Sequence, residues 1–267
     1  MKGKFDIDVV ADSTITKRRV QRATMPDYAK MKKPDVKLVI LGDMNVGKTS
    51  LLHRYTERKF KDTISTVGGA FFLKQWGPYN ISIWDTAGRE QFHGLGSLYC
   101  RGAAAVILTY DVTNWQSLAE LEDRFLSLTD TANSDCIFAI VGNKADLTDP
   151  RALVEEEGEE EKEVVPQLSS SPTGPPKFRK QVLREDAMAF YSRILRYKLL
   201  DEATSLPAES MCFETSAKTG YNVDLLFETL FNMVLPSILK KESQSCSPTV
   251  DLEECREVKR TKAGCCT

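Results

Sequence analysis

Gly42-Asp43-Met44-Asn45-Val46-Gly47-Lys48-Thr49 is the stretch that decides the fold of this chain. It follows the apolar run 36–41 and precedes residues 50–55, which are typical of a helix. The glycines at both ends of the loop allow a tight turn in which successive backbone N–H groups point inward, where they can bind a phosphate. The free N–H groups at the start of the following helix favour the same anion. The pattern therefore predicts a strand, a phosphate-binding loop and a helix, in that order.

The side chains of this loop have separate predicted roles. Lys48 adds a positive charge, and the short hydroxyl side chain of Thr49 is placed to bind Mg²⁺. The other predicted phosphate contacts are made by the loop itself and by the first turn of the helix, at Gly42, Asn45, Val46, Gly47 and Ser50. A plain glycine turn is the alternative, which the strand before the loop and the helix after it disfavour.

A second motif indicates the base of the nucleotide. Gly142-Asn143-Lys144-Ala145-Asp146 follows the apolar run 136–141, which we interpret as a buried parallel strand. Ligands of such sheets bind beyond the carboxyl ends of the strands. An ionised carboxylate only accepts hydrogen bonds, and guanine offers two donors on one edge where adenine offers none. We therefore expect a guanine nucleotide with Asn143, Lys144 and Asp146 at its base. Solvated loop residues are the alternative for this short motif.

Further motifs indicate a family to which the chain is similar. Trp84-Asp85-Thr86-Ala87-Gly88 ends the alternating run 79–84, and Thr215-Ser216-Ala217-Lys218 follows the short run 211–214. With these motifs in this order, the chain resembles the Ras superfamily. Its Rab branch is indicated by Tyr99-Cys100-Arg101-Gly102-Ala103 and by Tyr110-Asp111-Val112-Thr113-Asn114. Within that branch, the unusual loop 42–45 and the stretch 88–96 resemble one particular subtype.

The resemblance implies a switch that binds GTP or GDP with Mg²⁺ and hydrolyses GTP. In such proteins the γ-phosphate and the metal hold two loops that relax when the phosphate leaves. By the resemblance, Thr66 and Asp85 join Thr49 at the metal, Thr66 also belongs to the phosphate site, and the Gly88 N–H contacts the γ-phosphate. The resemblance likewise places Ser216, Ala217 and Lys218 at the guanine base.

Effectors of the family read an aromatic trio, onto which Phe71, Trp84 and Tyr99 fall. Simple burial in the core is the alternative role for these rings. The other partners that the resemblance implies are a guanine nucleotide exchange factor, a GTPase-activating protein (GAP), and a GDP-dissociation inhibitor or escort protein. The protein itself is expected to be a monomer.

One departure from the family concerns catalysis. Where the family has a glutamine that orients the attacking water, this chain has Arg89, which cannot accept the proton of that water. In the phosphate loop, Met44 and Asn45 replace small residues and can crowd an arginine finger supplied by a GAP. We therefore expect slow intrinsic hydrolysis. The alternatives are that Arg89 itself stabilises the transition state, that the protein holds nucleotide without turnover, or that it is a P-loop phosphotransferase.

Alternation of helices and strands predicts the α/β class: a doubly wound, six-stranded, mostly parallel P-loop sheet with one antiparallel edge strand and helices on both faces. The expected strands are 36–41, 70–76, 79–84, 103–110, 136–141 and 211–214, and the expected helices are 48–58, 91–99, 115–128, 183–199 and 222–239. These elements form one small GTPase domain, residues 31–240. Inside it, a run of glutamates followed by serines and prolines predicts a disordered insertion at about 150–180. Residues 1–30 are expected to be a disordered extension, native or from an alternative start.

The chain ends in a flexible tail, 241–267, that closes with Cys265-Cys266-Thr267. The resemblance implies that both cysteines carry geranylgeranyl groups. Two chains anchor a protein stably where one does not, and neighbouring Lys and Arg side chains favour an anionic leaflet. Idle surface cysteines are the alternative.

Composition narrows the remaining possibilities. The net charge of −2 gives no general affinity for nucleic acid. No apolar stretch reaches the roughly 18 residues of a membrane span, and the first thirty residues lack the core of a signal peptide. The 7 cysteines have no metal-ligand spacing, so reduced thiols are expected. From these features alone the protein is expected to stay cytosolic. The resemblance and the terminal cysteines imply the cytoplasmic face of endomembranes, of the Golgi, endosome or phagosome class, with a cytosolic pool.

Overall fold

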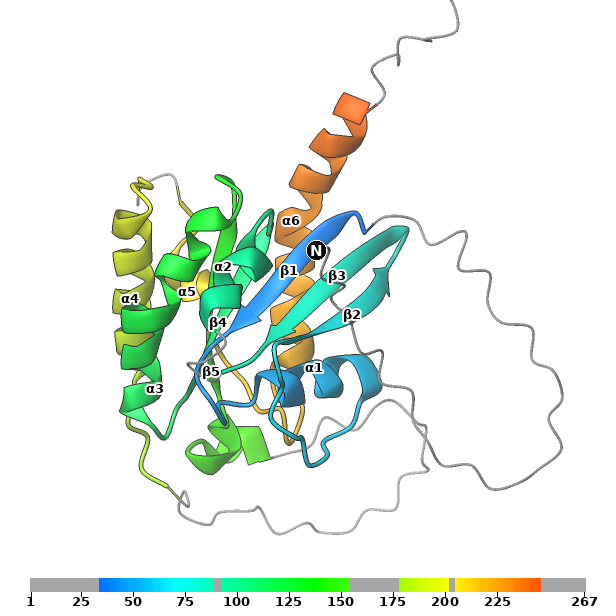
Figure 1. Cartoon of the computed structure of the whole chain (residues 1–267). Coiled ribbons are helices and arrows are strands. Elements are labelled where there is room, and N and C mark those ends of the chain that lie inside the picture. The colour runs from blue at the N-terminus through cyan, green and yellow to red at the C-terminus, as the bar shows by residue number, and fades with distance from the viewer. Residues whose placement is uncertain (1–33, 89–92, 154–177, 202–204, 246–267) are drawn as a thin grey trace, which may run out of the picture. The chain divides into compact units, whose positions relative to one another are not determined.

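The computed structural model describes residues 34–88, 93–153, 178–201 and 205–245 (Figure 1). These residues form a six-stranded sheet in the order β2-β3-β1-β4-β5-β6. The strands are β1 (Val36–Leu41), β2 (Gly69–Trp76), β3 (Tyr79–Thr86), β4 (Ala105–Asp111), β5 (Ile137–Asn143) and β6 (Cys212–Glu214). Only β2 and β3 pair antiparallel in this sheet, and the other neighbours run parallel. The predicted fold class is therefore confirmed, including its antiparallel edge strand.

Helices cover both faces of this sheet. They are α1 (Lys48–Glu57), α2 (His93–Cys100), α3 (Trp115–Glu120), α4 (Arg184–Tyr197), α5 (Ala208–Met211) and α6 (Val223–Ser245). Figure 1 shows α2, α3 and α4 on one face and α1 with α6 on the other. The rings of Tyr55 and Phe227 stack between α1 and α6, with centroids 4.2 Å apart. None of the helices within the described residues is both long enough and apolar enough to cross a membrane.

The burial of each strand follows from its place in the sheet. Every residue of the central strand β4 is buried, as expected for a parallel strand covered by helices on both sides. Strand β2, at the edge of the sheet, alternates between exposed and half-buried residues because successive side chains point to opposite faces of the sheet. Its turn to β3 needs a left-handed residue, and Gly77 supplies it with a φ of +55°. Central strands with buried flanks hold the loops at their carboxyl ends in fixed positions.

Some predicted boundaries were wrong. The helix expected at 115–128 is an α-helix only to Glu120 and continues as a π-helical turn (Leu121–Phe125) and a 3-10 turn (Ser127–Thr131). In the last turn, the Thr129 hydroxyl donates to Leu126 O at 2.6 Å, a local bond that competes with regular helix. The final helix runs to Ser245 rather than ending at 239, so the first residues of the expected tail are helical. The short helix α5 was not expected.

The start of the expected insertion is folded. Residues Pro150–Leu153 form a 3-10 turn, and the carbonyl of the buried Ala152 accepts from the Thr219 hydroxyl at 2.8 Å. Other sequence-based expectations fall outside the described residues: the extension 1–30, Arg89, the greater part of the insertion (154–177), and the lipidation residues Cys265 and Cys266.

Candidate nucleotide-binding site

The loop after β1 has the backbone that its glycines allow. Gly42 and Gly47 have φ angles of +148° and +96°. A Cβ added at Gly42 would lie 2.3 Å from Thr109 O, and one added at Gly47 would lie 2.3 Å from the Asn143 side-chain nitrogen. Because ordinary side chains rarely adopt these angles and no space exists for a Cβ, both positions require glycine. The loop is thereby packed closely against β4 and against the Asn143 side chain at the end of β5.

Lys48 occupies the interior of this loop. Its Nζ donates to Gly42 O at 2.8 Å and to Asp43 O at 2.7 Å. Burial lowers the pKa of Lys48 to about 8, and the charges of Asp85 and Asp43 oppose that change only in part. An ammonium group has three donors, so the described contacts leave one for a further acceptor. The amine is therefore placed to meet an anion in the pocket.

Two hydroxyl groups converge on one buried carboxylate. The Oγ1 atoms of Thr49 and Thr66 donate to Asp85 Oδ2 at 2.6 and 3.0 Å. Asp85 is fully buried, and within the described part of the chain its Oδ1 has no hydrogen-bond partner. Burial raises the pKa of Asp85, while both hydroxyl bonds and Lys48 oppose the increase. A buried carboxylate with one orphaned oxygen, next to two hydroxyls, provides the hard oxygen ligands that Mg²⁺ prefers. These residues therefore fit the metal.

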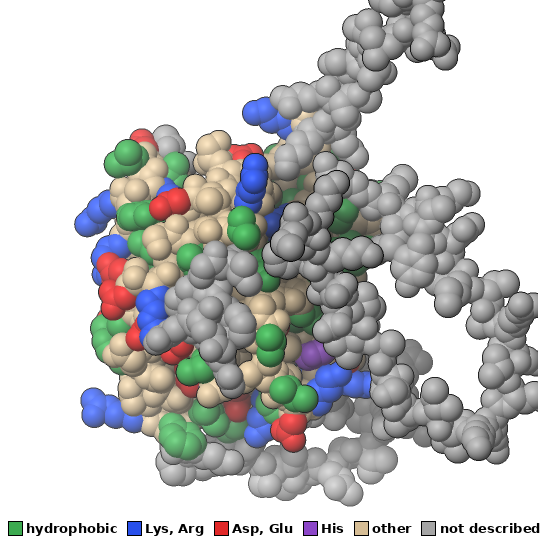
Figure 2. Space-filling model, in the orientation of Figure 1, with side chains coloured by type: hydrophobic (Ala, Val, Ile, Leu, Met, Phe, Trp, Pro, Cys, Tyr) green, Lys and Arg blue, Asp and Glu red, His purple; other side chains and the backbone are tan. Residues whose placement is uncertain are grey.

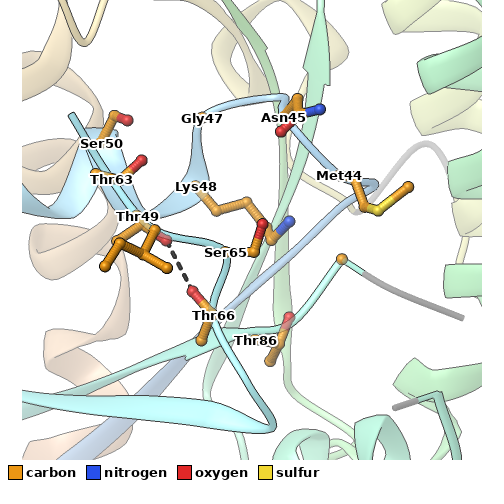
Figure 3. Close-up of a pocket in the computed structure, with 12 residues that line it drawn as sticks. Met44, Asn45, Gly47, Lys48, Thr49, Ser50, Thr63, Ser65, Thr66 and Thr86 are labelled. Carbon is orange, nitrogen blue, oxygen red and sulfur yellow. Dashed lines mark hydrogen bonds between the residues drawn. The ribbon is translucent and has the colours of Figure 1, made fainter. Parts of the chain in front are cut away.

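Around this centre is a pocket whose walls come from the phosphate loop, the start of α1 and the loop before β2 (Figure 3). Several residues expected at the phosphates line it, namely Asn45, Gly47, Lys48, Thr49, Ser50, Thr66 and Gly88. Gly42 and Val46 lie in the same loop without lining the pocket. Thr63, Ile64 and Ser65 also line the pocket and were not predicted, because the path of the loop before β2 is not evident from a motif. Thr86, at the end of β3, was not predicted as a lining residue either, although it stands in the motif 84–88.

Gly88 packs directly against the phosphate loop. A Cβ added at Gly88 would lie 2.6 Å from the Met44 nitrogen and 2.7 Å from Asp43 O, so only glycine fits. Met44 itself is half exposed and lines the pocket. Gly88 is therefore in contact with the phosphate loop at the pocket.

The base side of the site is built around Asn143. Its Nδ2 donates to Val46 O at 2.8 Å, and its Oδ1 accepts from the Ala217 N–H at 3.1 Å. Nearby, Asp146 Oδ1 accepts from the Ser216 hydroxyl at 2.6 Å. The structure thus brings the two sequence-distant motifs together at the carboxyl ends of β5 and β6, while Lys218 is exposed at the end of this loop.

Two residues that contact these motifs were missed. Asp111, at the end of β4, lies 2.6 Å from Lys144 Nζ through its Oδ2. Its other oxygen accepts from the Thr113 N–H and hydroxyl. Arg54, on α1, donates to the backbone of the Ala217-Lys218 segment. Asp111 stands in a motif that had indicated only the family, and no local pattern marks Arg54.

The aromatic trio forms one contiguous group. The ring centroids of Phe71 and Trp84 are 5.3 Å apart, and those of Trp84 and Tyr99 are 5.6 Å apart. Phe71 is 45% exposed, whereas the other two rings are half-buried against the core. The trio therefore combines both expected roles: Phe71 lies at the surface, and Trp84 and Tyr99 pack against the core. In the view of Figure 2, hydrophobic side chains are exposed singly or in small groups among charged ones.

These features define a P-loop nucleotide-binding protein of the guanine-recognising class. They are the glycine-bounded loop, the lysine, the hydroxyl and carboxylate centre and the buried Asp146.

Comparisons with known proteins agree with this class. The model of the Ras family matches residues 37–168. Ras-related protein Rab-20 of Homo sapiens is 65% identical over 236 residues, which cover 88% of this chain and 100% of the human protein. The Mus musculus protein of the same name is 64% identical over the same shares. Ras-related protein Rab-10 of Diplobatis ommata is 31% identical over 77% of this chain and 84% of its own length.

The chain therefore belongs to the Rab family of Ras-related small GTPases. Both the predicted family and the predicted likeness to one subtype, Rab-20, are confirmed. As a member of this family, the protein binds GTP or GDP with Mg²⁺, hydrolyses GTP and regulates vesicle traffic. The family also implies exchange factors, GAPs, GDP-dissociation inhibitors, effectors and lipid anchoring on endomembranes.

Proposed function

We propose that the protein is a slow GTP switch on the cytoplasmic face of endomembranes of the Golgi, endosome or phagosome class, with a cytosolic pool. The observation that carries this proposal is the convergence of Thr49 and Thr66 on Asp85. Thr49 belongs to the helix at the phosphates, and Thr66 belongs to the loop between α1 and β2. An ion bound beside Asp85 would therefore tie that loop to the nucleotide, which is what a phosphate-dependent switch requires.

In this proposal the phosphates are bound by the inward N–H groups of residues 42–50, by Lys48 and by the Gly88 N–H. Lys48 is already held inside the loop by two carbonyl oxygens, so its charge is presented with little loss of side-chain freedom. Thr49, Thr66 and Asp85 hold Mg²⁺, which when bound offsets the negative charge that develops on the phosphate oxygens. Asn143, Lys144, Asp146 and residues 216–218 hold the base.

Slow hydrolysis is proposed from two residues of the sequence, Arg89 and Met44. Arg89 immediately follows Gly88, which lies against the phosphate loop, and a guanidinium group can donate hydrogen bonds but cannot accept one from water. Met44 lines the pocket with a half-exposed side chain, where it would obstruct an arginine supplied by a GAP. The GTP-bound form is therefore long-lived, and Phe71, Trp84 and Tyr99 present it to effectors.

Anchoring is proposed through two geranylgeranyl groups on Cys265 and Cys266, at the end of a flexible tail that follows α6. In this proposal the GTPase domain spans residues 31–240, with α6 continuing to Ser245, and residues 1–30 form an extension. The disordered insertion lies within about 150–180, after the folded turn Pro150–Leu153. Basic residues before the cysteines, including Lys259, Arg260 and Lys262, add attraction of about 1 kcal/mol each to an anionic leaflet.

Two measurements test the proposal. The full chain and a Cys265→Ser/Cys266→Ser variant are expressed in cells as fluorescent fusions, and single-turnover phosphate release is followed on the purified GTP-loaded protein. We expect the intact chain on internal membranes, the variant in the cytosol, and release on a timescale of many minutes or longer. Equal membrane association of both forms would contradict the lipid anchor.

A second candidate, a scaffold that holds nucleotide without turnover, is favoured by Arg89 and Met44. The same assay separates it from a slow switch, because a scaffold would release no phosphate over days while remaining loaded. A P-loop phosphotransferase is the third candidate, and the buried Asp146–Ser216 pair, suited to guanine, disfavours it. Transfer of labelled phosphate from GTP to a small acceptor would support it instead.

A further inference from the structure

Arg54 connects helix α1 to the loop at residues 216–218, across a separation of 163 residues in the sequence. Its Nε donates to Ala217 O at 2.8 Å, and its Nη2 donates to the adjacent carbonyl oxygen of Lys218. The guanidinium group is a rigid planar fork, so it can hold two neighbouring carbonyls in a fixed orientation. A lysine can donate to two neighbouring carbonyls, as Lys48 does, but its single nitrogen on a flexible stem does not fix their orientation as a planar fork does.

The loop held by Arg54 orients the residues of the base site. The Ser216 hydroxyl donates to Asp146 Oδ1 at 2.6 Å and accepts from the Thr219 N–H at 3.1 Å. The Ala217 N–H donates to Asn143 Oδ1 at 3.1 Å. Ser216 is fully buried and Asp146 nearly so, and a hydrogen bond to a buried carboxylate fixes its direction strongly. A shift of this loop would therefore turn the Asp146 carboxylate.

Arg54 also lies on the helix that forms the phosphate site. Helix α1 begins at Lys48 and Thr49, and Arg54 follows about one and a half turns later. The same rigid element thus carries the phosphate-binding side chains at its start and the tie to the base loop farther along. Such an arrangement fixes the distance between the two halves of the site.

We propose that Arg54 is a positioning residue for guanine recognition: by clamping the carbonyls of Ala217 and Lys218 it keeps Ser216, and through it the Asp146 carboxylate, in place for the donors of the base. This inference rests on the proposed role of Asp146 at guanine. It differs from a purely structural role in one respect. A loss of packing lowers the affinity for every nucleotide alike, whereas a turned Asp146 reduces the preference for the base that offers it two donors.

The test compares GDP with inosine diphosphate, which lacks the 2-amino donor, by equilibrium competition on the full-length protein with Mg²⁺. The unmodified protein is expected to prefer GDP. In Arg54→Lys, which keeps the charge but not the fork, the ratio of the two affinities should fall roughly tenfold, the effect of one misaligned hydrogen bond to a charged group. The matched control is Arg58→Lys, one turn later on the same segment, whose exposed side chain pairs with Asp224 of α6. In Arg58→Lys the ratio of the affinities for GDP and inosine diphosphate should equal that of the unmodified protein.

A second comparison identifies the route through Ser216. In a Ser216→Ala background the ratio is already reduced, and adding Arg54→Lys should change it no further. An unchanged ratio in Arg54→Lys, or an equal loss for both nucleotides, would overturn the inference, as would full additivity with Ser216→Ala. The proposed function fails separately: if Asp146→Asn leaves the preference for GDP intact, Asp146 does not read the base at all.

Discussion

The hydroxyl oxygens of Thr49 and Thr66 lie 3.0 Å apart, although one residue starts a helix and the other belongs to a loop that ends at an edge strand. Both hydroxyls also donate to the same oxygen of Asp85. Because these three residues come from three different segments, the contact joins the phosphate helix, the loop before β2 and the end of β3. An ion held among them would stabilise all three positions together.

The first prediction concerns Thr49→Asn. The longer amide side chain removes the short hydroxyl that would bind the metal, so affinity for GTP should fall more than affinity for GDP, whose binding depends less on Mg²⁺. Dissociation constants for both nucleotides, measured with and without Mg²⁺, provide the check. Thr56→Asn is the matched control, because Thr56 is on the same helix and its hydroxyl donates to the Leu52 carbonyl of that helix. Equal losses for GTP and GDP in Thr49→Asn would contradict a metal-ligand role.

The second prediction is that Asp146→Asn shifts preference toward xanthine nucleotides. The change replaces one acceptor oxygen by a donor, so the match with the guanine donors is lost and the match with the xanthine carbonyl is gained. Affinity for GTP should fall roughly 10- to 100-fold, the effect of losing a hydrogen bond to a charged group. Competition among GTP, XTP and ATP measures it, with Asp149→Asn as control, since Asp149 pairs with the exposed Arg151. If ATP displaces GTP from the unmodified protein at similar concentration, guanine specificity is absent.

Motifs of the sequence predicted most of the fold and most of the site because each depends on local rules. The local backbone conformation depends on only a few neighbouring residues. The strand ends, the glycines and the motifs 42–49 and 143–146 were predictable for that reason. Contacts made across long separations left no such signal. Arg54 bonds to a carbonyl 163 residues away, and any residue could supply that acceptor. The π-helical turn at Leu121–Phe125 was also missed, because its apolar spacing is compatible with an ordinary α-helix.

The third prediction is a pH dependence of nucleotide binding that originates in Lys48. Burial lowers its pKa to about 8 from an ordinary 10.5. A bound phosphate, being negative, raises that pKa again, so binding above pH 8 requires proton uptake. Affinity for GDP should therefore be constant below pH 8 and fall by up to about tenfold per unit above it. The free energy of unfolding without nucleotide depends on pH in the opposite direction. Between pH 8 and 10.5 the Lys48 amine binds a proton more often in the unfolded chain than in the folded protein, so stability increases with pH.

Isothermal titration at several pH values measures this dependence. Guanine itself loses a proton at high pH, so Lys48→Met serves as the reference: it binds more weakly throughout and retains only the contribution of the base. The difference between the two proteins isolates Lys48. A difference that stays constant from pH 7 to pH 10 would show that the amine does not change its charge in the free site.

The last prediction is that Arg89→Gln raises intrinsic GTP hydrolysis. A glutamine amide can accept from the attacking water and donate to the γ-phosphate at once, whereas a guanidinium group only donates. A tenfold gain requires about 1.4 kcal/mol, within reach of one hydrogen bond and better alignment. Single-turnover phosphate release from the GTP-loaded full chain measures it. Because Met44 lines the pocket and can mask the gain, Arg89→Gln/Met44→Ser is measured beside both single variants. Unchanged or slower release in Arg89→Gln, with nucleotide still bound, would instead favour Arg89 as a group that stabilises the transition state.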